Sequence, residues 1–225
     1  LRQQVATEES QVYLDWLFSG MQYTISLTLI GFTIALLLGT LVGIFKNTNG
    51  IAGKIAQGFF EINRSIPLLA QVFLAYFVVP EIFPEITKHV STTSYSFLAG
   101  VISLGIYMSG RVASQVSAGL KALPKNQEQA CYAMGMSKFH TYTLVLLPQV
   151  FKNIFPSLTS EAMNTTKNSA VVGTIGLLEL SKQAQRIIDY TALSYEVFTI
   201  VVLSYVAINL VILGIGKLIY KKIGG

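Results

Sequence analysis

Three stretches of the chain are apolar for long enough to cross a lipid bilayer. Residues 16–45, 89–110 and 197–216 contain no Asp, Glu, Lys or Arg. About 20 consecutive apolar residues in a helix span the hydrocarbon core of a membrane. Each stretch therefore predicts a transmembrane helix, and the three together exclude an ordinary soluble enzyme.

Two further stretches are less apolar. Residues 65–80 reach membrane thickness only when the run is extended backward through residues 55–60. The stretch from 142 to about 175 is interrupted by three charged residues and two prolines, so its hydropathy alone does not decide whether it spans.

The charge of the loops decides the number of spans. Lys and Arg are retained on the cytoplasmic side, so successive loops alternate in charge when the spans are counted correctly. With five spans, the six polar segments carry net charges of −2, +2, −1, +2, −1 and +3 along the chain. We therefore expect an all-α integral membrane protein with five transmembrane helices, its N-terminus outside and its C-terminus cytoplasmic. The predicted spans are 20–46, 55–80, 95–119, 145–168 and 196–219.

Composition narrows the class further. The formal net charge is +5, but the Lys and Arg residues do not cluster beyond the pair Lys221 and Lys222, which argues against nucleic acid as a partner. The single cysteine supplies neither a disulfide framework nor a cysteine-rich metal site. No internal repeat or linker divides the chain, so residues 1–225 are predicted to form one transmembrane domain, with a cytoplasmic segment at about 120–143.

Charged residues at membrane depth are the strongest candidates for function. Arg111 shares one face of the third span with Ser103, Tyr107 and Ser114. In the fourth span, Glu161 recurs at helical spacing with Ser157, Asn164 and Asn168, and Lys167 lies beside them. A charge at this depth must face protein, water or a ligand.

Two interpretations of these polar faces remain open. Arg111 and Glu161 form either a structural ion pair between the third and fourth spans or part of a translocation route. The route accounts better for two complete faces of polar side chains. Five spans are few to enclose such a route, so a second membrane subunit is expected to complete it.

The predicted cytoplasmic segment carries a recognisable spacing of residues. Gln129, Ala130 and Cys131 are followed by Gly135 and, at the start of the next span, by Pro148. This spacing resembles the EAA loop of ABC importer permeases, in which a short helix docks on a partner ATPase. These five residues are therefore expected to couple the chain to an ATPase.

Other stretches resemble the polar amino-acid uptake family of these permeases, and in particular its glutamate/aspartate branch. They are residues 63–71, 111–116, 158–170 and 174–180. The resemblance implies a type I ABC importer architecture in the bacterial cytoplasmic (inner) membrane and a transport subunit that is not itself an enzyme. It also implies a second permease subunit, with a homologous heterodimer favoured over a homodimer, two ATPase subunits and an extracytoplasmic amino-acid-binding protein. No cofactor is expected in this chain, since ATP and Mg belong to the ATPase.

The charges suggest how an acidic amino acid is held. Arg111 is expected to bind one carboxylate through its planar guanidinium, which donates two parallel hydrogen bonds. Glu161 is expected to receive the ammonium, together with Asn164. The other carboxylate is expected at the break that a proline makes in the second span, formed by Ser65, Pro67 and Leu68.

Lys167 and Asn168 are expected to hold the residues that contact the cargo without contacting the cargo themselves. For Lys167 the alternative is that its side chain extends to the outer interface. Glu61 and Arg64 are interpreted as ordinary interfacial charges.

Three alternative functions follow from the same residues. The first alternative is the same ABC importer permease with glutamine, histidine or another polar amino acid as its cargo, since Glu161 alone suits a cation. An ion-driven secondary carrier or channel is disfavoured by the odd number of spans and the lack of inverted repeats. An intramembrane enzyme is disfavoured because no nucleophile and base accompany Arg111, Glu161 and Lys167.

Overall fold

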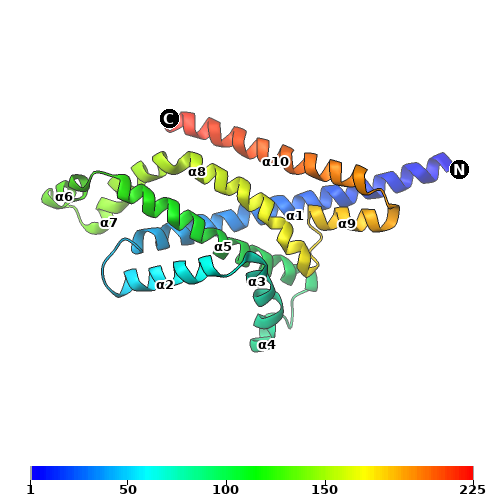
Figure 1. Cartoon of the computed structure of the whole chain (residues 1–225), viewed down its shortest axis with the longest axis horizontal. Coiled ribbons are helices and arrows are strands. Elements are labelled where there is room, and N and C mark those ends of the chain that lie inside the picture. The colour runs from blue at the N-terminus through cyan, green and yellow to red at the C-terminus, as the bar shows by residue number, and fades with distance from the viewer. Residues whose placement is uncertain (1, 225) are drawn as a thin grey trace.

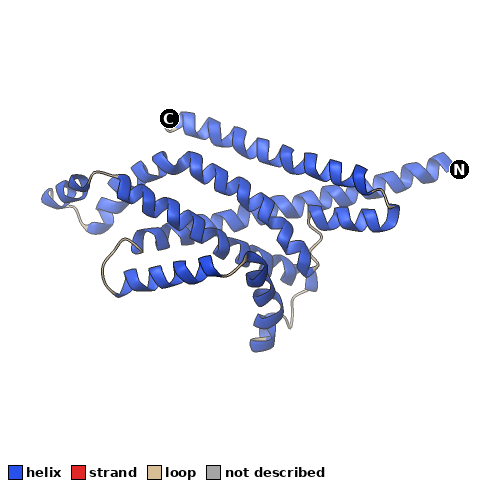
Figure 2. Cartoon of the chain, viewed as in Figure 1, coloured by secondary structure: helices blue, strands red, loops and turns tan. Residues whose placement is uncertain are grey.

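The chain folds into a bundle of helices (Figure 2). The computed structural model describes the backbone of residues 2–224 and the side chains of residues 12–224. Within that range the regular elements are helices, without a strand. The charge counted for the N-terminal segment includes Arg2, Glu8 and Glu9, whose side chains lie outside the described residues.

Among the described residues, three helices are long and apolar enough to cross a membrane: α1 (Arg2–Phe45), α5 (Thr92–Ala122) and α10 (Ser194–Lys222). They coincide with the predicted spans 20–46, 95–119 and 196–219. At 1.5 Å per residue, α1 is about 66 Å long, more than twice the roughly 30 Å hydrocarbon core. It therefore begins well before the predicted span.

The predicted span 55–80 is a broken helix. It consists of α2 (Ile51–Ser65), α3 (Leu68–Phe73), the π-helical turn η1 (Leu74–Val78) and α4 (Val79–Ile82), and its two halves are bent by 101°. Pro67 has no N–H to continue the helix, and Ile66 before it is extended, with φ −99° and ψ 121°. The bend turns α4 away from the bundle (Figure 1).

One side chain compensates for the break. The carbonyl of Asn63 would receive the N–H of residue 67 in a continuous helix, and Pro67 cannot donate it. Gln71 Nε2 donates instead to the Asn63 carbonyl at 3.3 Å and to the Ile66 carbonyl at 3.3 Å. It also donates to Asn63 Oδ1 at 3.0 Å. The Gln71 amide therefore satisfies two of the backbone acceptors at the break, where burial in a membrane makes an unpaired carbonyl costly.

The remaining elements lie between these helices and include the predicted cytoplasmic segment and the predicted fourth span. They are η2 (Pro84–Ile86), α6 (Lys125–Ala133), α7 (Lys138–His140), η3 (Thr141–Leu146), α8 (Leu147–Asn168), η4 (Ser169–Ile175) and α9 (Leu180–Thr191). In Figure 1, α6 and α7 lie at one end of the molecule, and α9 lies toward the other. Helix α8 covers most of the predicted span 145–168, but it does not meet the same hydropathy criterion as α1, α5 and α10.

Helix α5 is the centre of the bundle and α10 is its periphery. About 67% of the most apolar window of α5 is buried, against 6% for α10. The core consists of Leu104, Met108, Val112 and Val116 of α5, packed between α1 and α8. The helices that can build a site are therefore those around α5.

The carboxylate of Glu179 joins three helices, α1, α9 and α10. The side chain is fully buried and caps α9, accepting hydrogen bonds from the backbone N–H groups of Ser181 and Lys182 at 3.0 and 2.7 Å. It also accepts from Tyr205 of α10 at 3.0 Å and from Thr24 of α1 at 3.5 Å. A residue that the sequence presents as an outer-loop charge thus anchors the outer segment.

Small residues allow α1 and α5 to approach closely. A Cβ atom on Gly39 would lie 2.6 Å from the Ser109 carbonyl oxygen and 2.6 Å from Val112 Cβ. The backbone atom cannot move aside without displacing the helix. Close contact of this kind replaces hydrophobic burial as the force between helices in lipid.

We expect Gly39→Ala to lower the melting temperature of the purified protein, because overpacking a helix contact costs about 1–3 kcal/mol. The matched control is Gly58→Ala on α2, where a Cβ meets nothing within 4 Å. Since alanine favours a helix over glycine by about 1 kcal/mol, Gly58→Ala should leave the melting temperature unchanged or raise it. Equal effects of the two substitutions would contradict this account of the contact.

Candidate functional site

A polar cavity of about 400 Å³ opens between α2, α5 and α8. Its lining comes from all three helices and consists of Asn63, Arg64, Tyr107, Gly110, Arg111, Ser114, Gln115 and Glu161. The cavity brings together the two polar faces that the sequence places on separate spans.

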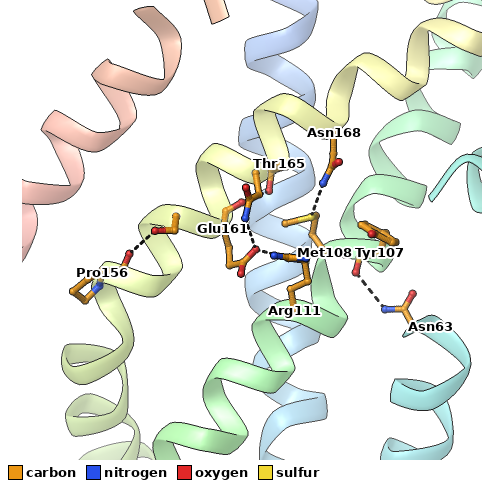
Figure 3. Close-up of polar contacts among 10 residues, drawn as sticks. Asn63, Tyr107, Met108, Arg111, Pro156, Glu161, Thr165 and Asn168 are labelled. Atoms are coloured by element: carbon orange, nitrogen blue, oxygen red, sulfur yellow. Dashed lines mark hydrogen bonds and ion pairs between the residues drawn. The ribbon is translucent and has the colours of Figure 1, made fainter. Parts of the chain in front are cut away.

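The central contact of the cavity is an ion pair. Arg111 Nε donates to Glu161 Oε2 at 2.6 Å, joining α5 to α8 (Figure 3). The Glu161 side chain is 8% exposed and the Arg111 side chain 48%. Asn164 Nδ2, one turn along α8, donates to the same carboxylate oxygen at 3.2 Å. Glu161 is therefore held in place, while Arg111 remains partly open to the cavity.

The charge of the cavity is positive. Arg64 and Arg111 contribute two guanidinium groups and Glu161 one carboxylate. The Arg64 guanidinium lies 5.4 Å from the centre of the Phe60 ring, within the range of a cation–π contact. A cavity lined by two cations and one anion favours a ligand that carries two anionic groups and one cationic group.

A close approach of α2 to α5 shapes the cavity wall. Asn63 Nδ2 donates to the backbone carbonyl of Ile106 at 2.8 Å. A Cβ atom on Gly110 would lie 2.8 Å from that same nitrogen. The absence of a side chain at Gly110 thus permits the hydrogen bond that joins α2 to α5.

The residues predicted at the proline break do not line this cavity. Ser65 Oγ donates to the Glu61 carbonyl at 2.8 Å, within its own helix. Leu68 is buried in the apolar core and Pro67 is exposed. Pro67 and Leu68 lie at and after the 101° bend, and α3 then packs beside an earlier part of α5, where Ser103 Oγ donates to the Gln71 carbonyl at 3.3 Å.

The two polar residues predicted at the outer end of the fourth span are placed differently from each other. Asn168 Nδ2 lies 3.5 Å from Met108 Sδ, between α8 and α5. Lys167 is exposed. Neither lines the cavity, so their predicted supporting role stays a prediction.

Sequence reasoning missed Arg64 and Gln115 as lining residues. Arg64 was interpreted as an interfacial charge, yet it lines the cavity together with Arg111. Its position two residues before the break was the available signal, because the chain leaves the helix there. Gln115 lies four residues after Arg111 and so extends the polar face that was already recognised.

The segment that resembles the EAA loop is a short helix with a glycine termination. At the end of α6, the N–H of Met136 donates to the carbonyl of Cys131 at 3.0 Å, and the N–H of Gly135 to that of Tyr132 at 2.9 Å. This pair of bonds is the Schellman motif, and Gly135 adopts the left-handed conformation that it requires, with φ 81°.

Gln129 and Ala130 are exposed on α6, while Cys131 is buried. Tyr132 donates to Glu128 at 2.8 Å, and desolvation together with this bond raises the pKa of Tyr132 to about 12. The phenol therefore stays protonated and keeps the bond at neutral pH. Pro148 lies in the first turn of α8, directly after the π-helical turn η3.

Residues 35–225 match the family described as binding-protein-dependent transport system inner membrane component. The chain is 37% identical over 217 residues to the glutamate/aspartate import permease protein GltJ of Escherichia coli strain K12, across 94% of this chain and 88% of that protein. It is 31% identical over 208 residues to the putative glutamine transport system permease protein GlnP of Rickettsia typhi, across 92% of each.

A solved structure has the same fold. It is described as an amino acid ABC transporter with histidines, and it superposes with a TM-score of 0.78 at 29% identity. The match covers 95% of this chain and 97% of that chain.

We expect Arg111 and Glu161 to be energetically coupled. Replacing Arg111 by Ala leaves a buried carboxylate without its cation, so a double-mutant cycle of Arg111→Ala and Glu161→Ala should show a coupling of about 1–3 kcal/mol. The exposed pair of Lys88 and Glu85, 3.3 Å apart, is the control and should show less than about 1 kcal/mol. Thermal unfolding of the four variants of each cycle measures both values, and additive losses at Arg111 and Glu161 would contradict the coupling.

Proposed function

The chain belongs to the family of binding-protein-dependent transport system inner membrane components, and we propose that its cargo is glutamate or aspartate. It is a multi-pass protein of the cytoplasmic membrane and the permease subunit of an amino-acid ABC importer. It is a transport subunit, and ATP hydrolysis belongs to a separate subunit in this family. The observation that carries the proposed cargo is the pair of arginines and the single carboxylate that line one cavity. The 37% identity to a glutamate/aspartate import permease supports it independently.

The charges of the cavity complement those of an acidic amino acid. Glutamate and aspartate carry two carboxylates and one ammonium. The partly exposed Arg111 binds one carboxylate through its guanidinium fork. Arg64 on the neighbouring helix binds the other, and Glu161 receives the ammonium with Asn164 beside it. The ligand thereby replaces the direct contact between Arg111 and Glu161.

The residues around the proline break remain part of the proposal in a different state of the importer. Ser65 and the backbone at Pro67 and Leu68 lie outside the present cavity, and a rotation of α2 relative to α5 is needed to bring them to it. Lys167 and Asn168, at the outer end of α8, are proposed to support the cargo on entry.

A neutral or cationic cargo is the second candidate. The carboxylate of Glu161 suits the guanidinium or imidazolium of a basic amino acid, and similar proteins include a putative glutamine permease and an amino acid transporter with histidines. The second arginine argues against a cation, because it places a like charge beside any cationic side chain.

The proposed topology has five spans in a single domain of residues 1–225. Helix α8 is the additional span, since its polar face is turned to Arg111 and its opposite face is apolar. The alternation of loop charge supports an external N-terminus and a cytoplasmic C-terminus.

The proposed assembly contains a second, homologous permease subunit, two ATPase subunits and an extracytoplasmic binding protein. A heterodimer is favoured because the cavity of one chain is already charge-complementary to the cargo, so its partner need not repeat it. ATP and Mg bind to the ATPases, and no cofactor is proposed for this chain. ATP binding shifts the pair between inward-open and outward-open states through α6, which requires that the two states differ in affinity for the cargo.

The first test of the cargo is glutamate uptake by the assembled importer in liposomes. Losing a charge-assisted hydrogen bond costs about 1.5–3 kcal/mol, so Arg111→Ala and Arg64→Ala should each lower uptake roughly 10- to 100-fold. Arg64→Ala should also reduce the preference for glutamate over glutamine. Lys54→Ala on α2 removes a charge away from the cavity and should leave uptake unchanged. Normal uptake by intact Arg111→Ala importers removes Arg111 from the substrate role.

The second test concerns coupling through α6. Valine at position 135 cannot adopt φ 81° without a cost of about 1–2 kcal/mol, so Gly135→Val should disrupt the helix end and lower the ATPase activity stimulated by the loaded binding protein. Gly135→Asn is the matched control, because asparagine tolerates the left-handed conformation. If both variants retain full stimulation, the helix end at Gly135 has no part in coupling.

A further inference from the structure

A second cavity lies on the far side of α8 from the arginines. It is an apolar groove of about 310 Å³ between α1, α8 and α10. Its lining consists of Thr28, Leu29, Phe32, Thr33, Leu36, Phe155, Leu158, Thr159, Ala162, Ile212, Ile215, Gly216 and Ile219. None of these residues lines the polar cavity, so the groove is not part of the proposed cargo site.

The walls of the groove face the membrane. Helix α10 packs mainly on α8 and α9 and is the least buried of the three most apolar helices (Figure 1). On the two sides of the groove, Leu29 of α1 is 63% exposed and Ile215 of α10 is 53% exposed. In a bilayer these surfaces contact hydrocarbon, so the groove opens toward lipid.

Two lysines follow the groove at one of its ends. Lys152 lies one turn before Phe155 on the same face of α8, and Lys222 lies three residues after Ile219 on α10. Lys152 extends to the turn that follows α10, with its Nζ 3.1 Å from the position of a Cβ on Gly224. Both walls thus continue into a lysine at the same end of the molecule.

An aromatic pair between α8 and α10 lies close to these lysines along the chain. The rings of Phe155 and Tyr220 are stacked, 6.2 Å apart with an angle of 13° between their planes. This places the change from apolar to basic surface at the level of the membrane interface, where tyrosine is enriched.

We propose that the groove binds one anionic glycerophospholipid, with an acyl chain between α1, α8 and α10 and the phosphate group between Lys152 and Lys222. The chemistry of the two parts of the groove matches the two parts of such a lipid. With the cytoplasmic C-terminus proposed above, the lipid belongs to the inner leaflet.

Two features of the groove together favour a lipid over other occupants. A helix of another subunit would cover the apolar walls but leave the two lysines without an anion. A free phosphate ion would use the lysines but not the apolar groove.

The proposal is tested by native mass spectrometry of the assembled importer, stripped of lipid and titrated with phosphatidylglycerol or phosphatidylcholine. We expect one phosphatidylglycerol to be retained per copy of this chain. Ala162→Phe fills the groove and should abolish retention, and Thr33→Phe does the same from α1 if the first variant does not assemble. Val211→Phe, on the exposed side of α10 outside the groove, is the control.

The headgroup is tested separately. Each lysine near an anionic lipid surface contributes about 1 kcal/mol, so Lys152→Gln with Lys222→Gln should weaken phosphatidylglycerol binding roughly thirtyfold. The pair should leave phosphatidylcholine binding unchanged, and Lys54→Gln should have no effect. Undiminished retention by both groove-filling variants overturns the proposal. The proposal is also overturned if the unmodified protein retains the two lipids equally. Crosslinking of Ala162→Cys to another subunit overturns it as well.

Discussion

The structure depends on one constraint, which is that a charge or backbone group buried at membrane depth needs a polar partner. Arg111 and Glu161 satisfy each other at 2.6 Å and in doing so join α5 to α8. The same rule operates at the outer end, where the buried carboxylate of Glu179 takes its partners from α1, α9 and α10. Since lipid offers no competing hydrogen bonds, these few polar contacts specify which helices are neighbours.

The polar cavity depends on these contacts between helices and on the helix break at Pro67. Pro67 stops the second membrane segment, and Gln71 compensates for the lost backbone bonds. The bend ends α2 beside the middle of α5, where Gly110 leaves room for Asn63. As a result Arg64 and Arg111 line the same cavity, which is what the proposed binding of a dicarboxylate requires.

Helix α8 serves two surfaces of opposite character. One face carries Glu161 and Asn164 toward the polar cavity, and the other carries Leu158 and Ala162 toward the apolar groove. This division explains its intermediate hydropathy, since a helix that is polar on one side cannot reach the average of a helix in lipid. It also means that an occupant of the groove contacts the same helix that carries Glu161 of the polar cavity, on its opposite side.

The sequence alone determined the helical class, the positions of the most apolar spans and the location of Arg111 and Glu161 on polar faces. These are local properties, because the transfer of a side chain into lipid and the spacing of residues on a helix depend only on the chain itself. Only the tertiary structure decided which polar residues meet. The packing of α2 on α5 placed Arg64 in the cavity, and the bend of 101° at Pro67, which no periodicity encodes, ends α2 there. The burial of Glu179 and the groove beside α10 were likewise settled by helix packing, since both depend on residues far apart in the chain.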